Sequence, residues 1–120
     1  MLSLSFIQKL ISSPKFEILN SQNSEIYFVL KARNGEIILT SETYKNKAGA
    51  LKGIESVRKN AINESNFEIR TSSDGRKYFV LKSGNRKVIG MSEMYNSLEK
   101  AKKGINSVQS VSKTQKVNFV

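Results

Sequence analysis

The segment Tyr27–Lys31 reads YFVLK, and the same five residues recur at Tyr78–Lys82, 51 positions further along the chain. The match continues on both sides without a gap. Between residues 16 and 57, 20 of 42 positions are identical to the residue 51 positions later, whereas chance gives roughly 3. The other matched segments are Phe16-Glu17-Ile18 with Phe67-Glu68-Ile69, Ser41-Glu42-x-Tyr44 with Ser92-Glu93-x-Tyr95, and Lys52-Gly53-Ile54-x-Ser56-Val57 with Lys103-Gly104-Ile105-x-Ser107-Val108. The chain is therefore a tandem duplication.

Each copy begins with a pattern typical of strands. Residues 16–20 alternate weakly, and residues 25–32 are rich in the aromatic and β-branched side chains that suit a pleated surface. Asn34-Gly35 separates this run from a third, residues 36–41, and Asn-Gly between apolar runs is a strong hairpin signal because both central residues can take a positive φ. The second copy has Asp74-Gly75 between its first two strands and Gly84-Asn85 at the next turn.

A helix is predicted after Tyr44 and again after Tyr95. Asn46 and Ser97 are good N-cap residues at equivalent positions. Ala50, Ile54, Val57 and Ala61 have helical spacing in the first copy, as do Ala101, Ile105 and Val108 in the second. Gly53 and Gly104 flank these stripes, which indicates that the helix backbone packs closely against the sheet. A further short strand follows each helix, at residues 67–71 and 116–120.

Composition limits the possible chemistry. The 120 residues include no Cys and no His, so the chain has neither a thiol nucleophile nor the commonest general base and imidazole metal ligand. No motif for a nucleotide-binding loop, a zinc protease or a nucleophile elbow occurs, and the carboxylates lack calcium-loop spacing. We therefore expect a protein that is not an enzyme and that uses no metal and no cofactor.

Several segments together resemble the YegP-like family of small bacterial proteins, whose domain has no assigned function. In the first copy they are Asn34-Gly35-Glu36-Ile37-Ile38-Leu39-Thr40-Ser41-Glu42-x-Tyr44, Lys47-Ala48-x-Ala50 and Gly53-Ile54-Glu55-Ser56-Val57-x-Lys59-Asn60-Ala61. In the second they are Tyr78-Phe79-Val80-Leu81-Lys82 and Val88-Ile89-Gly90-x-Ser92-Glu93-Met94-Tyr95. The resemblance covers roughly residues 15–111. It implies β3-α-β units that share one sheet and exchange their last strands, and it supplies no catalytic residues.

The predicted fold is α+β, with two tandem β-β-β-α-β units forming one antiparallel sheet, two helices on one face and terminal strands exchanged between the units. Residues 1–14 are expected to be a leader, and residues 15–120 a single domain made of repeats at about 15–66 and 67–120. The expected core comprises Phe28, Leu30, Ile38, Ile54, Val57, Phe79, Leu81, Ile89, Ile105 and Val108. The second copy departs from the first at residues 83–87, so a site built on that turn would differ between the halves.

The duplicated corner between the third strand and the helix is one candidate ligand site. Its residues are Ser41, Glu42, Tyr44, Ser92, Glu93 and Tyr95. They could form a paired polar site of carboxylates and hydroxyl donors. The same residue types also serve as strand-to-helix corners, in which Ser and Glu bond free backbone groups and Tyr packs on the sheet.

The net charge of the chain indicates a second candidate binding site. Lys and Arg number 20 against 10 Asp and Glu, a net charge of +10 that attracts polyanions and also keeps a small protein soluble. The basic residues gather around the two helices, where they would form a nucleic-acid surface or a solvated helix face. The candidate contacts are Lys45, Lys47, Lys52, Lys59, Lys100, Lys102 and Lys103.

Three functions follow as hypotheses: a non-enzymatic binding or interaction module, a nucleic-acid-binding protein, and an enzyme that uses the Ser-Glu-x-Tyr corner. Possible partners are a protein or a polyanion. No apolar run reaches the length of a membrane helix, and residues 1–12 lack a basic segment ahead of their apolar residues. We expect a cytoplasmic monomer with internal pseudo-two-fold symmetry.

Overall fold

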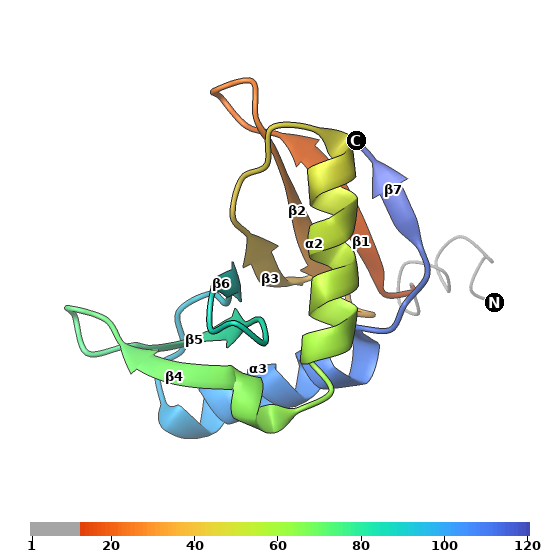
Figure 1. The fold of residues 1–120 in the computed structure, drawn as a ribbon. Coiled ribbons are helices and arrows are strands. Elements are labelled where there is room, and N and C mark those ends of the chain that lie inside the picture. The colour runs from red at the N-terminus through yellow and green to blue at the C-terminus, as the bar shows by residue number, and fades with distance from the viewer. Residues whose placement is uncertain (1–12) are drawn as a thin grey trace, which may run out of the picture.

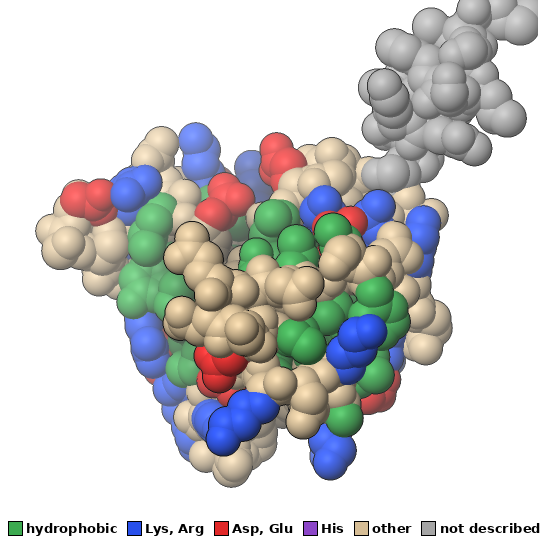
Figure 2. Space-filling view, turned by 90° about the horizontal axis from the view of Figure 1, so that it is seen from above, with side chains coloured by type: hydrophobic (Ala, Val, Ile, Leu, Met, Phe, Trp, Pro, Cys, Tyr) green, Lys and Arg blue, Asp and Glu red, His purple; other side chains and the backbone are tan. Residues whose placement is uncertain are grey.

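A computed structural model describes residues 13–120, drawn as a ribbon in Figure 1 and with its side chains in Figure 2. The described residues form one seven-stranded sheet with two helices. The predicted leader, residues 1–14, lies outside the described residues except for its last two positions. Among the described residues, no helix is both long enough and apolar enough to cross a membrane.

Each repeat contributes three strands and then a helix, as predicted. The first copy contains β1 (Lys15–Asn20), β2 (Ile26–Lys31), β3 (Ile37–Ser41) and α2 (Lys47–Asn60). A short 3₁₀ turn, η1 (Glu64–Asn66), leads into the second copy, which contains β4 (Phe67–Thr71), β5 (Lys77–Lys82), β6 (Val88–Met91), α3 (Leu98–Val111) and β7 (Val117–Phe119). Both predicted N-caps are confirmed, because the side chain of Asn46 accepts from the Gly49 amide and that of Ser97 from the Lys100 amide.

The strands lie in the order β4-β5-β6-β3-β2-β1-β7. The strand that follows α2, β4, pairs with β5 of the second repeat, and the strand that follows α3, β7, pairs with β1 of the first. Figure 1 shows β7 alongside β1, although these strands lie at opposite ends of the described chain. The predicted exchange of terminal strands is therefore confirmed.

The prediction of a wholly antiparallel sheet is wrong at one pair, because β1 and β7 run parallel. The pseudo-two-fold relation explains the direction. It makes β1 and β4 equivalent strands. Because β4 directly follows α2, the strand that follows α3 would by symmetry take the position and direction of β1. That position beside β2 is already occupied by β1, so β7 pairs with the outer edge of β1 and runs in the same direction. The Phe16 amide donates to the Lys116 carbonyl at 2.9 Å, and Thr114 Oγ1 donates to the Pro14 carbonyl at 2.8 Å.

The pairing of β3 with β6 joins the two repeats. Thr40 is opposite Met91, and these residues are also equivalent by the 51-residue repeat, so the pseudo-two-fold axis passes between them. One position earlier, Leu39 and Gly90 are the equivalent pair. A Cβ atom on Gly90 would lie 2.8 Å from Cγ of the fully buried Leu39. Two large side chains do not fit here, and the chain places leucine on one side of the axis and glycine on the other.

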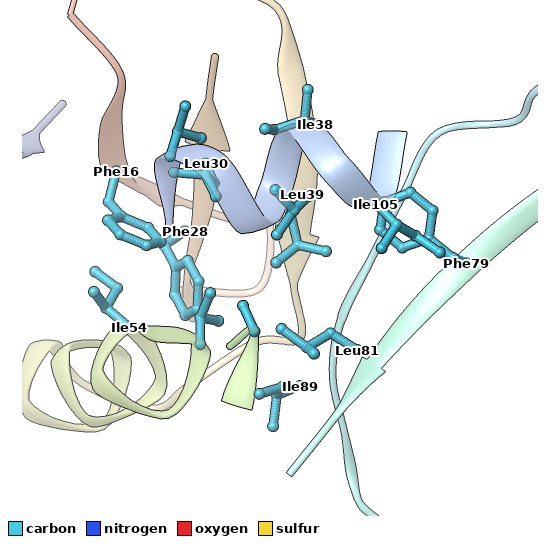
Figure 3. Packing of buried hydrophobic residues seen from close by; sticks show 14 of the residues in the cluster. Phe16, Phe28, Leu30, Ile38, Leu39, Ile54, Phe79, Leu81, Ile89 and Ile105 are labelled. Atoms are coloured by element: carbon cyan, nitrogen blue, oxygen red, sulfur yellow. The ribbon is translucent and has the colours of Figure 1, made fainter. Parts of the chain in front are cut away.

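Both helices cover the same face of the sheet. Leu30 is paired with Leu39 and Leu81 with Gly90, and directly opposed residues of antiparallel strands point to the same side. One buried cluster contains these leucines together with Ile54 of α2 and Ile105 of α3, as Figure 3 shows. Every residue of the predicted core is buried. The two repeats therefore share one hydrophobic core.

The hairpin turns differ from the prediction. In the β2–β3 and β5–β6 turns, the positive φ values fall at Gly35 (84°) and at its equivalent Arg86 (69°), and not at Asn34, Gly84 or Asn85. The Gly35 amide donates to the Ala32 carbonyl at 2.9 Å, and the Arg86 amide donates to the Ser83 carbonyl at the same distance. This is the three-residue hairpin loop, in which a type I turn is followed by one residue in the left-handed region. The second copy places an arginine where the first has the glycine that this position favours.

Replacing Arg86 with Gly is expected to stabilise the protein. The left-handed conformation costs a non-glycine residue roughly 1–2 kcal/mol, and the added freedom of glycine in the unfolded chain offsets part of that gain. We predict a net gain of about 0.5–1 kcal/mol in the free energy of unfolding, measured by urea denaturation. The reverse change, Gly35→Arg, should destabilise; equal stability of both variants and the wild type would contradict this account of the turn.

Replacing Gly90 with Ala is expected to destabilise the protein by about 1–3 kcal/mol, because the added methyl group overpacks the contact with Leu39. The double variant Gly90→Ala/Leu39→Val should lose less stability than the sum of the two single variants, since the smaller side chain makes room at the axis. Additive losses would show that the two residues do not compete for the same space.

Candidate functional site

The two serines of the repeated corner hold the backbone at the ends of β3 and β6. Ser41 Oγ accepts from the Phe28 amide at 2.9 Å and donates to the Glu42 carbonyl at 2.7 Å. Ser92 Oγ does the same with Phe79 at 2.9 Å and with the Glu93 carbonyl at 2.8 Å. Each hydroxyl thus substitutes for a ladder hydrogen bond. Its proton is directed to a carbonyl, so it is not presented to a ligand.

The two tyrosines pack between the sheet and their helix. The ring of Tyr44 stacks on Phe28 with 6.0 Å between centroids, and the backbone of Tyr44 pairs with Ile26. The end of the ring lies over Gly53, where a Cβ atom would approach Cζ of the tyrosine to 2.6 Å. Tyr95 repeats the arrangement over Gly104, with a corresponding distance of 2.7 Å. The recurrent glycines are thus explained by close packing, as predicted.

Four of the six predicted corner residues meet at one place. Ser41, Glu42, Ser92 and Glu93 all line a hollow of about 430 Å³ over the β3–β6 pair, next to the pseudo-two-fold axis. The remaining lining is mostly apolar and comes from Ile37, Thr40, Val88, Gly90 and Met91. We call this the central hollow. It is formed by equivalent residues from both repeats, and its carboxylates come from Glu42 and Glu93.

The tyrosines are not part of the central hollow. Tyr44 and Tyr95 line two separate grooves, each between the helix of one repeat and the β-turn of the other. The first groove lies between α2 and the β5–β6 turn and has a volume of about 750 Å³. The second groove lies between α3 and the β2–β3 turn and has a volume of about 240 Å³. Each groove thus requires both repeats.

The grooves differ at the turn whose sequence departs between the copies. Lys87 lines the first groove where its equivalent, Glu36, lines the second. Burial and, to a smaller extent, the carboxylate of Glu42 raise the pKa of the Tyr44 hydroxyl. The pKa of Tyr95 is raised by burial, then by Glu93 and also by Glu36. The surroundings of Tyr95 in the second groove are therefore more negatively charged than those of Tyr44 in the first.

The basic residues predicted as nucleic-acid contacts do not form one site. Lys52 and Lys59 line the first groove, whereas Lys100 and Lys103 line the second. The Lys47 ammonium lies 4.9 Å from the ring centroid of Phe119, as in a cation–π contact. The two other candidates, Lys45 and Lys102, are exposed. On the face shown in Figure 2, Lys and Arg side chains stand mainly around the margin.

Two further lysines at equivalent strand ends are paired with carboxylates. Lys31 Nζ lies 2.8 Å from a carboxylate oxygen of Glu17, and Lys82 Nζ lies 2.6 Å from one of Glu68. Hydrogen bonds from Lys82 and then Arg70 lower the pKa of the Glu68 carboxyl to about 2. These lysines are therefore engaged within the sheet.

The sequence did not single out the apolar lining of the central hollow or Lys87. Ile37, Val88 and Met91 read as ordinary strand residues, and only the strand order shows that they meet. For Lys87 a signal was present, since the turn at residues 83–87 departs from its repeat partner. Among the described residues, no group of three or more Asp, Glu, His or Cys side chains is placed to hold a metal ion.

The duplicated strands, the exchanged termini and the shared core define a class of small α+β proteins built from two copies of one unit. A family model described as a domain of unknown function (DUF1508) matches the chain twice, at residues 21–68 and 72–118. The chain belongs to this family, which includes the YegP proteins.

Individual relatives agree with that assignment. The UPF0339 protein YegP of Escherichia coli O157:H7 is 48% identical over 102 residues, covering 85% of this chain and 93% of the relative. The UPF0339 protein plu2779 of Photorhabdus laumondii is 52% identical over 92 residues, covering 77% and 81%. The solution structure of yegP from E. coli, titled a protein of unknown function, has a TM-score of 0.84 at 44% identity and covers 91% of this chain and 94% of that one. The solution structure of the UPF0339 protein SO3888 from Shewanella oneidensis has a TM-score of 0.83 at 42% identity, with coverage of 89% and 91%.

Replacing Gly53 with Ala is expected to destabilise the protein by about 1–3 kcal/mol, because the methyl group would overlap the end of the Tyr44 ring and come within 2.9 Å of Phe28. Gly84→Ala is the matched control, since nothing lies within 4 Å of a Cβ atom there. Its effect on the free energy of unfolding, from urea denaturation, should stay within about 0.5 kcal/mol. Equal effects at both positions would contradict the packing role of Gly53.

Proposed function

We propose that the protein is a non-enzymatic interaction module that acts as a monomer in the cytoplasm and binds a protein partner through the central hollow. One observation carries the proposal: residues from both repeats meet around the pseudo-two-fold axis in an apolar hollow that remains open to solvent. The exposed fractions of Ile37 and Met91 are 44% and 43%. Large exposed apolar side chains that cluster in a hollow are typical of interaction sites.

The chemistry of the hollow selects the partner. Methionine adapts its shape to different apolar side chains, so Met91 suits a binding surface. The carboxylates of Glu42 and Glu93 line the same hollow in a chain whose net charge is +10. An apolar side chain flanked by Lys or Arg would satisfy both features, and electrostatic complementarity would favour such a segment over an acidic one.

The enzymatic hypothesis has less support. The hydroxyl protons of Ser41 and Ser92 are directed to backbone carbonyls, and neither serine has a histidine to act as its base. The raised pKa values of Tyr44 and Tyr95 make these hydroxyls weaker acids near neutral pH. The corner residues therefore fit structural and binding roles better than proton transfer.

The nucleic-acid hypothesis rests on net charge. Single-strand binders combine a basic groove with exposed aromatic rings on which bases stack. Here the rings of Tyr44 and Tyr95 are stacked on Phe28 and Phe79 of the core. The lysines nearest to them are divided between two grooves, so a continuous track for a phosphate backbone has little support.

Capture from a native lysate on immobilised protein, with and without nuclease treatment, tests the proposal. Met91→Asp places a charge in the hollow and is expected to abolish capture of the partner. Leu98→Asp is the matched control, because Leu98 on α3 has a similar exposed fraction of 46% but lies outside the hollow. We expect the control to retain capture, and amide spectra should show that both variants are folded.

Two outcomes would contradict the proposal. Equal capture by the wild type and the Met91→Asp variant would show that the hollow is not the binding surface. Loss of capture after nuclease treatment would instead favour the nucleic-acid hypothesis.

A further inference from the structure

The first groove presents positive charge from two opposite walls. Lys52 and Lys59 project from α2, and Lys87 projects from the facing β5–β6 turn. All three side chains are exposed. An anion in this groove would therefore be contacted from both sides.

The negative charges of the first groove are partly engaged. Glu55 forms an ion pair with Arg58, and Glu42 lies 3.9 Å from Lys87 Nζ. Within residues 13–120, neither Lys52 nor Lys59 forms an ion pair. Their charges are thus available to a ligand.

The second groove has the same architecture, but its positive charges lie on one wall only. Its cations, Lys100 and Lys103, both come from α3, while the facing turn contributes Glu36. The position equivalent to Lys59 is Ser110. An anion between these walls would meet a carboxylate opposite the lysines, so like-charge repulsion opposes its binding.

The spacing of the cations indicates the kind of anion. Lys52 and Lys59 are seven residues apart, which puts them on the same side of α2 at roughly 10 Å along its axis. One phosphate group cannot contact both ammonium groups without bending the long side chains together. Two or more linked phosphates span the distance more easily. Lysine binds phosphate as a point charge, and a groove of about 750 Å³ is large enough for a small organic ligand.

We propose that the first groove binds a small compound that carries two or more phosphate groups, and that the second groove does not. Lys52, Lys59 and Lys87 contact the phosphates. Hydroxyl and amide side chains at Tyr44, Ser56 and Asn85 also line the groove and provide uncharged polar contacts. This site is independent of the central hollow, since the two share only Glu42 among their lining residues.

Titration of ¹⁵N-labelled protein with inorganic pyrophosphate at constant ionic strength tests the proposal. We expect saturable shifts of the amides of Gly49, Gly53, Lys59 and Asn85 in the first groove, and smaller shifts at their equivalents in the second. The double variant Lys52→Gln/Lys59→Gln should weaken binding about tenfold or more, because two charge-assisted contacts are lost. The matched control, Lys100→Gln/Lys103→Gln, should change affinity less than about twofold.

Exchange of charge at the turns provides a second readout. Lys87→Glu should weaken binding in the first groove, and Glu36→Lys should produce new shifts in the second. Thermal unfolding of each variant checks that the fold is retained, which is expected because all of the altered side chains are exposed.

Several results would overturn the proposal. The first is shifts of equal size in both grooves, and the second is equal weakening of binding by the two double variants. The third is the absence of saturable shifts up to about 10 mM pyrophosphate, since a Kd above this concentration means negligible affinity. A single-stranded oligonucleotide of mixed sequence serves as a further arm. If it binds more tightly than pyrophosphate and shifts Lys45, Lys47 and Lys102 as well, the surface recognises a nucleic-acid backbone instead.

Discussion

The pairing of β3 with β6 is the interaction on which the rest of the structure depends. It sets Thr40 opposite Met91 on the pseudo-two-fold axis and brings Leu39 over Gly90. The central hollow lies over this pair. The same pairing places the β2–β3 turn against α3 and the β5–β6 turn against α2, and the two grooves lie between these elements. Neither repeat alone contains a complete site or a complete core, since Phe28, Phe79, Ile54 and Ile105 all belong to one buried cluster.

Duplication gives the two halves one shape but not one chemistry. Near the axis equivalent residues lie against each other and cannot both have large side chains, as with Leu39 and Gly90. Away from the axis no such constraint applies, and the exposed turns differ in charge at Glu36 and Lys87. The hollow thus keeps the same serines and glutamates from both repeats but not the same apolar side chains, whereas the grooves differ in charge. A duplicated chain can in this way keep one binding surface common to both halves and make another surface specific to one half.

Much of the fold could be predicted from the repeat, because strand propensity, helix spacing and N-caps are local properties that occur twice. The core residues were predicted for the same reason.

The parallel β1–β7 pair depends on which sheet position is already occupied, and local patterns do not contain that information. The left-handed conformation of Arg86 was missed because its loop geometry is set by the hydrogen bonds of the flanking strands and not by its own residue type. The repeated Ser-Glu-x-Tyr motif suggested one site, but its serines lie at the hollow, its tyrosines line separate grooves, and each glutamate borders both the hollow and one groove. Adjacent residues at a strand-to-helix corner face different sides, and only the three-dimensional arrangement shows which neighbours they meet.

If the shared core joins the two repeats, they unfold as one cooperative unit. Urea unfolding followed by amide resonances measures this, with Phe28 reporting on β2 and Phe79 on β5. We expect both resonances to disappear with the same midpoint, and Gly53→Ala, a change confined to the first repeat, to shift both midpoints equally. Separate midpoints for the two strands, or a shift limited to Phe28, would show that each half folds by itself and that the core does not join them.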